Sequence, residues 1–326
     1  MQGLPNLWRP QSEVFNASLS ATVLSLACSD QLVFHTIAMS HSPMTCAIYQ
    51  DESRVRLPFV DRGGGSLIFR YETTTKSDIP TVLKIPQRYG KFSPDGTMVP
   101  DPRNEYASNL DNEKAIYKRL QGTPGIANYL GAAKDGFLLE YHKQGCLEDF
   151  MYPPSLRQTA PQETPAPKIP PPEWPQRKNW ILQILDIYTA IHAQKVLVRD
   201  IALRNLLLAD DFTIRAIDFE QSWLLPLDHT GELHDEDGYT EMAEISNVAN
   251  VIYSLSRWEK FEKELLRMEE WPDAKELPSA VDLPLGRVIA DAWSRRFGTI
   301  DELRQATVSA LTSTPSVGRT KSNGLQ

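Results

Sequence analysis

The stretch LVRDIALRNLLL, residues 197–208, decides the fold that we expect, together with AIDFEQSW at residues 216–223. Apolar residues dominate the first stretch, but four polar side chains interrupt it: Arg199, Asp200, Arg204 and Asn205. The second stretch adds two acids, Asp218 and Glu220, on either side of one phenylalanine. Charges among apolar residues are costly unless they are paired, hydrogen-bonded or bound to a metal. These polar residues therefore predict a shared functional site.

The segment between the two stretches, NLLLADDFTIRAID at 205–218, has the pattern of a two-stranded hairpin with ADDF as its turn. A hairpin places Asn205 at one side of its open mouth and Asp218 at the other, so both side chains can reach one metal ion. Asp200 precedes Asn205 by only five residues. We therefore expect these three side chains to lie together.

The composition bounds the class of protein. The 326-residue chain is 41% hydrophobic and 23% charged, which is ordinary for a globular protein with a proper core. Its formal net charge of −8 argues against nucleic acid or an anionic membrane as the main partner. Three widely separated cysteines, Cys28, Cys46 and Cys146, argue against a disulfide framework or a zinc site and favour a reducing compartment. With no 18-residue apolar run and only a weak signal-like segment, we expect a cytoplasmic protein, with the nucleus as the alternative.

The first half of the chain is expected to form a small sheet with one helix. Residues 1–50 lack a sustained period and are interpreted as an extension of unknown role. SLIFRYET at 66–73 and TVLKI at 81–85 are runs typical of strands, and IANYLGAAKDGFLLEYH reads as two strands around the turn AKDG. NEYASNLDNEKAIYKRLQG at 104–122 has the spacing of a helix. Residues 51–141 thus form the smaller lobe of an expected α+β fold.

The second half is expected to be a larger, mainly helical lobe over residues 142–311. Nine of the chain's 24 prolines fall within 153–175, which predicts an exposed insert without regular structure. NWILQILDIYTAIHAQK at 179–195 has the apolar spacing of a buried helix. Three later segments are also interpreted as helices, at 244–269, 285–296 and 300–311. The tail 312–326 is expected to be disordered, because Ser, Thr, Gly and Lys dominate it.

A lysine and a glutamate in the smaller lobe are candidates for an ion pair. Lys84 ends the apolar run VLK on an expected strand, and Glu113 lies early on the expected helix, on the side of Ile116 and Leu120. An acid beside a core-facing stripe needs a cation, and Lys84 is the available partner. We expect the two charged groups to lie within salt-bridge distance, about 4 Å. A single lysine or glutamate, taken alone, is more often a solvent-exposed charge than part of a functional site.

With these residues in place, the chain resembles the protein kinase family over roughly residues 55–310. Six segments carry the resemblance: VLK (82–84) is similar to the strand motif V-A-I-K, FLLEYHKQG (137–145) to the stretch joining the two lobes, VRDIALRN (198–205) to the catalytic loop H-R-D-L-x-x-x-N, IDFE (217–220) to the D-F-G motif, EISNVANVIYSL (244–255) to the helix D-I-x-S-L-G-x-x-x-Y, and AWSRRFGTIDEL (292–303) to the last helices. The resemblance implies a bilobal α+β fold that binds ATP and Mg²⁺. It extends in particular to the divergent, compact kinase-like domains of filamentous fungi.

The resemblance implies a role for each polar residue at the centre of the site. Asp200 would orient or deprotonate the acceptor hydroxyl, and Asn205 and Asp218 would hold Mg²⁺. Lys84, held by Glu113, would contact the α- and β-phosphates of ATP.

Further residues are implied around the nucleotide. Arg204 would lie near the γ-phosphate, as in the A-A-R-N variant of the catalytic loop. Gly63 and Gly65 of DRGGGSLIF would form the phosphate loop. The backbone at Glu140 and His142 would bind adenine.

The activation segment is where the chain departs furthest from the family. Only 25 residues separate Asp218 from Glu244, and no A-P-E motif occurs. The segment contains the acidic stretch LDHTGELHDEDGY at 227–239. Arg199 would bind a phosphorylated or acidic group on this segment, or serve only as a polar packing residue.

Four single positions also depart from the family pattern. Val198 replaces the catalytic-loop histidine, and Ile68 stands where a third loop glycine is usual. Glu244 replaces the aspartate that braces the catalytic loop, a change of one methylene. Glu220 replaces the glycine of D-F-G, which would cost about 1–3 kcal/mol if a glycine-specific conformation is needed there.

The function implied is that of an ATP-dependent protein serine/threonine kinase, since every polar catalytic position is filled. Two alternatives stay open: a pseudokinase that acts as a scaffold, and a choline-kinase-like phosphotransferase acting on a small molecule. The expected partners are a protein substrate and, for the proline-rich insert, an SH3 or WW-type domain. Neither nucleic acid nor a membrane is expected as a partner.

Overall fold

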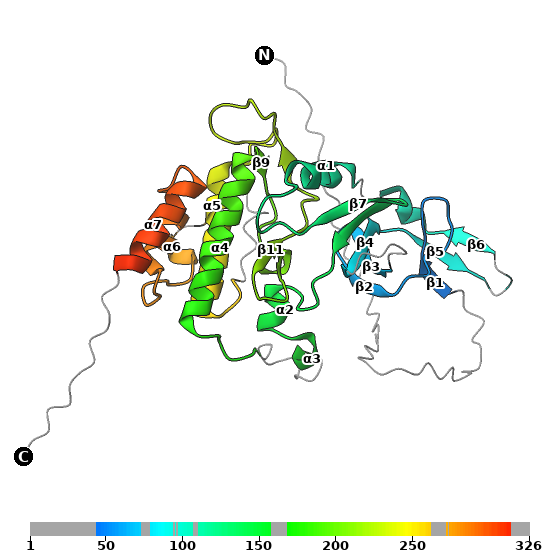
Figure 1. Cartoon of the computed structure of the whole chain (residues 1–326), viewed down its shortest axis with the longest axis horizontal. Coiled ribbons are helices and arrows are strands. Elements are labelled where there is room, and N and C mark those ends of the chain that lie inside the picture. Colours follow the sequence, from blue (N-terminus) through cyan, green and yellow to red (C-terminus); the bar gives the residue numbers. More distant parts are fainter. Residues whose placement is uncertain are drawn as a thin grey trace, which may run out of the picture. The chain divides into compact units, whose positions relative to one another are not determined.

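The computed structural model describes residues 44–72, 79–93, 95, 97–106, 110–157, 168–261, 272 and 274–313. The chain divides into two units after Ser42, and the first unit lies outside the described residues. In the described part the fold is mixed α+β, with most strands before residue 141 and most helices after it (Figure 1). None of the described helices is both long and apolar enough to cross a membrane.

Five antiparallel strands form the main sheet, in the order β2-β3-β4-β8-β7. Their bounds are β2 Phe59–Arg62, β3 Ser66–Tyr71, β4 Thr81–Pro86, β7 Tyr129–Ala133 and β8 Gly136–Glu140. The predicted strands at 66–73 and 81–85 and the predicted strand pair around AKDG are thus confirmed, whereas β2 was not predicted.

Strand β4 shows how this sheet separates two cores. Its residues alternate between the faces, as the pleat requires. Val82 belongs to the large core, whereas Leu83 and Ile85 belong to a smaller one on the opposite face. Lys84 shares the face of Val82, and it therefore points toward the side where the helices lie.

A second, three-stranded sheet was not predicted. It has the order β1-β5-β6, with β1 Met44–Ala47, β5 Tyr89–Phe92 and β6 Met98–Pro100. Ala47 and Tyr89 pack against the smaller core. Residues 44–47 therefore belong to the strand region rather than to the expected extension 1–50. Strands of three or four residues carry too little alternation to be recognised in a sequence.

Helix α1, Asp111–Arg119, lies within the predicted helix 104–122 but is shorter. A 3₁₀ turn, η1 Pro102–Tyr106, precedes it, and residues 107–109 lie outside the described ones. After the helix, Gly122 has a φ of 82°, which favours glycine and turns the chain toward β7. Glu113, Ile116 and Tyr117 are buried, so one face of α1 packs on the large core.

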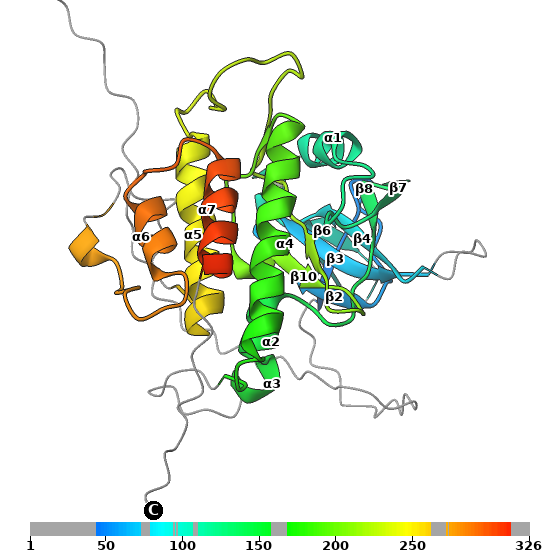
Figure 2. The ribbon, with the colours of Figure 1, turned by 60° about the vertical axis from the view of Figure 1, so that its left-hand side comes forward.

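Helices make up most of the rest of the described fold. Their bounds are α2 Leu147–Met151, α3 Pro154–Arg157, α4 Trp174–Ala193, α5 Glu241–Arg257, α6 Gly286–Trp293 and α7 Ile300–Ser313, with a 3₁₀ turn η4 Ala274–Glu276. Helix α4 packs against α5 and α7, and α6 packs against α5 and α7 (Figure 2). Of the predicted helix 244–269, α5 covers the residues to Arg257, where Trp258 takes a left-handed conformation, and residues 262–269 lie outside the described ones. The tail is helical to Ser313, and residues 314–326 lie outside the described ones.

The proline-rich insert is only partly the exposed loop that was expected. Helix α4 begins inside it at Trp174, since proline at the first turn of a helix loses no hydrogen bond. Ile169 packs on the large core, and its carbonyl accepts a 2.8 Å hydrogen bond from Nε1 of Trp258. Residues 158–167 lie outside the described ones, so an SH3 or WW-type ligand in the insert stays a prediction.

The predicted hairpin between Asn205 and Asp218 is confirmed. It consists of β10 Leu206–Leu208 and β11 Ile214–Ala216, which pair in antiparallel fashion. A 3₁₀ turn, η2 Leu203–Asn205, leads into it, and a short pair of β9 Val196–Leu197 with β12 Trp223–Leu224 lies beside it. Helix α4 anchors the hairpin: Oε1 of Gln183 accepts a 2.8 Å hydrogen bond from Ile214 N, and Nε1 of Trp180 donates to Phe212 O.

Candidate functional site

Two adjoining cavities form a cleft between the main sheet and the loops around the β10–β11 hairpin. Their volumes are about 690 and 540 Å³. They share five lining residues: Asp61, Ile68, Leu139, Arg204 and Ile217. The predicted residues of the larger cavity are Gly63, Gly65, Lys84, Asp200, Arg204, Asn205 and Asp218. Those of the smaller cavity are Glu140, His142 and Arg204.

Lys84 joins two carboxylates that come from distant parts of the chain. Its Nζ lies 2.8 Å from the Glu113 carboxylate and 2.7 Å from Oδ1 of Asp218. The predicted contact between Lys84 and Glu113 is thus confirmed. Burial alone would lower the pKa of Lys84, but the two carboxylates outweigh it and raise that pKa above its ordinary value. The ammonium group is therefore fully charged at neutral pH.

The backbone of Lys84 leaves no room for a side chain at Gly136, the residue that begins β8. A Cβ atom added to Gly136 would lie 1.9 Å from the carbonyl oxygen of Lys84. Only glycine permits β8 to approach β4 so closely at this point, and the approach places Lys84 opposite Phe137. Phe137 is fully buried, so the part of β8 that pairs with Lys84 on β4 is packed into the core.

Glu113 is the most enclosed acid of the cleft, with no exposed side-chain surface. Its Oε1 accepts a hydrogen bond from Phe219 N at 3.2 Å in addition to the contact with Lys84. Burial raises the pKa of Glu113 to about 7, against the opposing effect of Lys84. Glu113 therefore lies behind Lys84 as its anchor and does not line either cavity.

The segment Asp218–Glu220 has a backbone that differs from the sequence expectation. Asp218 has a φ of 64°, a left-handed conformation, whereas Glu220 does not have a positive φ. The condition on which glutamate in place of glycine at position 220 would be costly is therefore not met, and the unusual conformation falls on Asp218. Phe219 is fully buried with its ring 5.1 Å from that of Tyr117, and the Tyr117 hydroxyl accepts a 3.4 Å hydrogen bond from Asp218 N.

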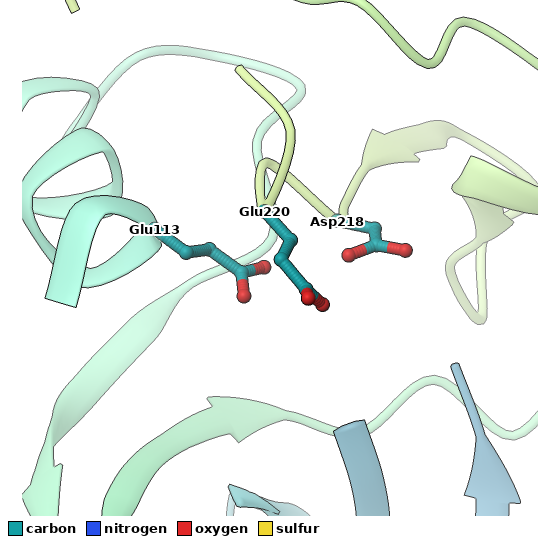
Figure 3. A group of neighbouring side chains, drawn as sticks. All are labelled: Glu113, Asp218 and Glu220. Atoms are coloured by element: carbon teal, nitrogen blue, oxygen red, sulfur yellow. The ribbon is translucent and has the colours of Figure 1, made fainter. Parts of the chain in front are cut away.

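Glu220 adds a third acid to the cleft. One carboxylate oxygen from each of Glu113, Asp218 and Glu220 lies within 4.8 Å of the others, an arrangement that could hold a metal ion (Figure 3). Glu113 comes from α1, and the other two come from the loop after β11 (Figure 3). Only one of them, Asp218, had been predicted as a metal ligand. The carboxylate chemistry suits a hard divalent cation such as Mg²⁺ or Mn²⁺.

Asp200 is held in place by its own loop. Nη2 of Arg204 donates to Oδ1 at 2.5 Å, and Nδ2 of Asn205 donates to Oδ2 at 3.0 Å. Nδ2 of Asn205 also donates to the backbone oxygen of Asp200 at 2.9 Å. The backbone oxygen of Asn205 accepts from Ile217 N at 3.0 Å, which ties this loop to the residue before Asp218. The three residues predicted to lie together therefore line one cavity.

The glycine turn between β2 and β3 closes one side of the larger cavity. Gly63 N donates to Ser66 O at 2.9 Å, and Gln87 N donates to Gly65 O at 2.8 Å. A Cβ atom on Gly63 would lie 2.9 Å from Oγ of Ser66, so a side chain there would require Ser66 to move.

The smaller cavity lies at the end of β8. Glu140 accepts a 2.5 Å hydrogen bond from Nδ2 of Asn128, and its backbone nitrogen donates to Asn128 O. His142 is buried, and burial lowers the pKa of its imidazole, which is therefore neutral at pH 7. Apolar side chains, among them Val82 and Leu207, complete a lining suited to a flat ring.

A buried cluster contains Glu244, the residue that stands in place of the bracing aspartate, together with His192 and Glu241, which the sequence analysis missed. Nδ1 of His192, on α4, lies 3.0 Å from Oε1 of Glu241, and its Nε2 contacts Oε2 of Glu244. Burial would lower the pKa of His192, but the two carboxylates outweigh it and raise that pKa to about 9. Burial raises the pKa of Glu244 to about 7, and hydrogen bonds from His192 and from the backbone of Val198 oppose that rise. For His192, the signal in the sequence was a histidine within an apolar helix.

A scan against models of known protein families and a search of curated proteins found no match to this chain.

Proposed function

We propose that the protein is an ATP-dependent phosphotransferase with the bilobal fold of the protein kinases, acting on a serine or threonine hydroxyl of a protein. The observation that carries the proposal is the cation Lys84 between Glu113 and Asp218, across one cavity from Asp200 and Asn205. Phosphoryl transfer needs a cation on the phosphates, ligands for magnesium and an acid beside the acceptor. These groups come from four separate segments and meet in one cleft.

In this proposal each residue acts on a defined group. Asn205 and Asp218 would hold Mg²⁺, which neutralises charge on the phosphates when bound, and Lys84 would bind the α- and β-phosphate oxygens. The acceptor oxygen forms a bond to the γ-phosphorus as the bond to the β–γ bridging oxygen breaks. The proton of the acceptor hydroxyl passes to Asp200, and Arg204 leaves Asp200 to bind the transferred phosphoryl group.

The smaller cavity supports a nucleotide as the donor. It offers an apolar slot beside the backbone of Glu140 and His142, and it is continuous with the cavity that holds Lys84. A base in the slot would leave its phosphates directed toward Lys84. The volume of each of the two cavities falls within the range of ligand and cofactor sites.

A second candidate acceptor is a small-molecule alcohol. The observation that favours it is the compact segment between β12 and α5, in which Asp235, Asp237 and Tyr239 pack on Arg199. A segment drawn back in this way leaves little surface on which an extended peptide could lie.

Thermal unfolding with and without Mg²⁺–ATP tests the proposal. A ligand that binds only the folded state stabilises it, by about 2.7 kcal/mol at a hundredfold excess over its Kd. Asp218→Asn should abolish this shift, because it removes a charged metal ligand and little volume. Asp200→Asn should keep the shift and lose turnover, measured with labelled ATP on a generic protein substrate and on choline-like alcohols.

Three results would contradict parts of the proposal. No shift in the wild-type protein would exclude nucleotide binding. A shift without transfer to any acceptor would leave a nucleotide-binding scaffold. Transfer to the small alcohol alone would replace the protein substrate.

A further inference from the structure

The two cavities of the cleft meet at five shared lining residues, and one of the five is an acid. These residues are Asp61, Ile68, Leu139, Arg204 and Ile217. In the proposed function the smaller cavity takes the base of a nucleotide and the larger cavity takes its phosphates, so the group at their junction is the sugar. The residues that the resemblance implies would bind the base, the phosphates and the metal, and none of them would bind the sugar. The polar side chains at the junction are therefore the candidates for that contact.

The pairing of the strands places Asp61 on the cleft face of the main sheet. Asp61 on β2 lies opposite Ile68 on β3, and Ile68 lies opposite Lys84 on β4. Side chains that lie directly opposite one another in an antiparallel sheet project from the same face. Because Lys84 faces the cleft, Asp61 faces it as well, about 10 Å away across one intervening strand.

A bulge in β2 brings Asp61 to this face. Phe59 pairs with Phe69, but the next pair is Asp61 with Ile68, so Val60 is an extra residue in β2. In a regular ladder Val60 would lie opposite Ile68, and Asp61 would project from the other face of the sheet. Bulges are common next to active sites, where they redirect a side chain. Here the bulge turns an acid toward the junction of the two cavities.

The carboxylate of Asp61 is fixed at one oxygen and available at the other. Its Oδ1 accepts a 2.7 Å hydrogen bond from Arg62 N. The side chain is exposed, and among the residues that the structure describes no hydrogen bond or ion pair reaches its Oδ2. The hydrogen of a sugar hydroxyl needs an acceptor, and a carboxylate oxygen forms a short, charge-assisted hydrogen bond with such a donor.

The other acids that line the cleft each border one cavity only. Glu140, Glu148 and Asp149 line the smaller cavity, and Asp200, Asp218 and Glu220 line the larger one. Arg204 borders both cavities, but its Nη2 donates to Asp200, and a guanidinium group has no acceptor to offer. Asp61 is therefore the side chain at the junction that can accept a hydrogen bond from a sugar hydroxyl.

We propose that Asp61 binds a ribose hydroxyl of the nucleotide, so that the site selects a ribonucleoside triphosphate as phosphoryl donor. The inference rests on the proposed function. The hydroxyl would donate its hydrogen to Oδ2, while Oδ1 keeps its bond to Arg62 N. The negative charge of Asp61 repels the phosphates, so the favourable contribution of this residue is confined to the sugar.

Titration calorimetry with Mg²⁺–ATP and with Mg²⁺–2′,3′-dideoxy-ATP tests the contact. The wild-type protein should bind ATP about tenfold more tightly, as expected for a hydrogen bond to a charged group. In Asp61→Ala the ratio of the two Kd values should fall below about twofold, because neither nucleotide then has an acceptor beside its sugar. The change in repulsion of the phosphates acts on both ligands alike, so it cancels in the ratio.

Two further variants separate the carboxylate from the turn that it stabilises. Asp61→Asn keeps an acceptor for Arg62 N but removes the charge, and its ratio should fall to about threefold. Asp95→Ala is the matched control, because Asp95 is an exposed aspartate whose Oδ1 accepts a 3.0 Å hydrogen bond from Thr97 N and which lines neither cavity. Its ratio should equal that of the wild-type protein. A ratio that falls in Asp61→Ala and stays at the wild-type value in Asp61→Asn would assign the effect to the turn and overturn the sugar contact.

The two proposals fail in different ways. If the wild-type protein binds no Mg²⁺–ATP, the proposed function fails and the sugar contact fails with it. If ATP binds but the wild-type ratio is near one, or stays near tenfold in both Asp61 variants, the sugar contact alone fails. If the ratios change as expected and no acceptor is phosphorylated, the sugar contact stands and the protein is a nucleotide-binding scaffold.

Discussion

The protein contains two clusters in which one cation lies between two carboxylates, and only one of them faces a cavity. The cleft cluster is Lys84 with Glu113 and Asp218, and the buried cluster is His192 with Glu241 and Glu244. In the first, the Asp218 side chain is 26% exposed and lines the larger cavity. In the second, every side chain is at most 9% exposed, and none lines the cleft.

This difference in exposure separates the two clusters. In the cleft cluster, Glu220 brings a third carboxylate oxygen close to those of Glu113 and Asp218, an arrangement that could hold a metal ion, and both Asp218 and Glu220 line the larger cavity. In the buried cluster, Ile300 N donates a hydrogen bond to Oε1 of Glu241 at 3.0 Å. The first cluster is therefore accessible to a ligand, whereas the second is an enclosed structural brace between α4 and α5.

Removing the cation of the buried cluster should have the largest effect on stability. We expect His192→Gln to lower the free energy of unfolding by ~3 kcal/mol, because it leaves two buried carboxylates without their partner. Urea unfolding at pH 7 measures this, with His229→Gln on a loop as the matched control that should change stability by less than ~0.5 kcal/mol. Equal effects of the two substitutions would show that the buried cluster is not a brace.

The buried cluster should also make stability depend on pH. The pKa of His192 is raised from 6.5 to about 9 in the folded state, so its contribution is complete below pH 6.5 and is lost as pH rises through about 9. The shift corresponds to ~3 kcal/mol. Glu244, with its pKa raised to about 7, changes stability in the same direction.

Unfolding free energies at pH 6.5, 8 and 9.5 check this dependence. Other groups that act on the cluster are Lys195, Tyr188 and Tyr239, and the His192→Gln variant retains all of them. The loss of stability above pH 6.5 should therefore be smaller in that variant. A wild-type stability that stays level from pH 6.5 to 9.5 would contradict a charged His192.

The cation of the cleft cluster should matter more for binding than for stability. Lys84→Met should abolish the thermal shift caused by Mg²⁺–ATP, because the phosphates lose their charged partner. The free energy of unfolding should fall by ~2 kcal/mol, less than in His192→Gln, since only the enclosed Glu113 loses its partner while water in the cavity can solvate Asp218. Lys91→Met, at an exposed position of β5, serves as the control that keeps the shift; a shift retained in Lys84→Met would remove Lys84 from the site.

The smallest effect is expected at Glu220. Glu220→Gln removes one of three carboxylates near the metal position, so Mn²⁺ should bind a few-fold more weakly, with stability nearly unchanged. Titration calorimetry with Mn²⁺ alone measures the change. An affinity equal to that of the wild-type protein would show that Glu220 lies near the metal position without contributing to it.

Features encoded over short stretches could be predicted from the sequence. The hairpin between Asn205 and Asp218 followed from two apolar runs and a polar turn, and the strands carrying Lys84 and Glu140 followed from their β-branched and aromatic residues. The contact of Lys84 with Glu113 was predictable because each lies on an element with a clear buried face. Local propensity and periodicity were sufficient for these parts.

Other features had no short-range signal. The β1-β5-β6 sheet joins strands of three or four residues, and β1 and β5 lie more than forty positions apart. The left-handed conformation at Asp218 was not predicted, and Glu220, where a glycine-specific conformation was considered, does not adopt one. Register and backbone conformation of this kind depend on what the rest of the chain packs against the segment.

The sequence by itself determined which side chains are available for chemistry: Lys84, Glu113, Asp200, Asn205 and Asp218, each marked by a charge or amide in apolar surroundings. Only the tertiary structure decided which buried ion pairs lie around these side chains. His192 meets Glu241 and Glu244 across a separation of about fifty residues, and Arg199 meets Asp235 across thirty-six. In the sequence, Glu241 and Asp235 are ordinary acids, and only Glu244 was singled out, through the resemblance. Folding determines which acid pairs with which cation, because a charge removed from water must be paired and the packing of the chain decides which opposite charge lies next to it.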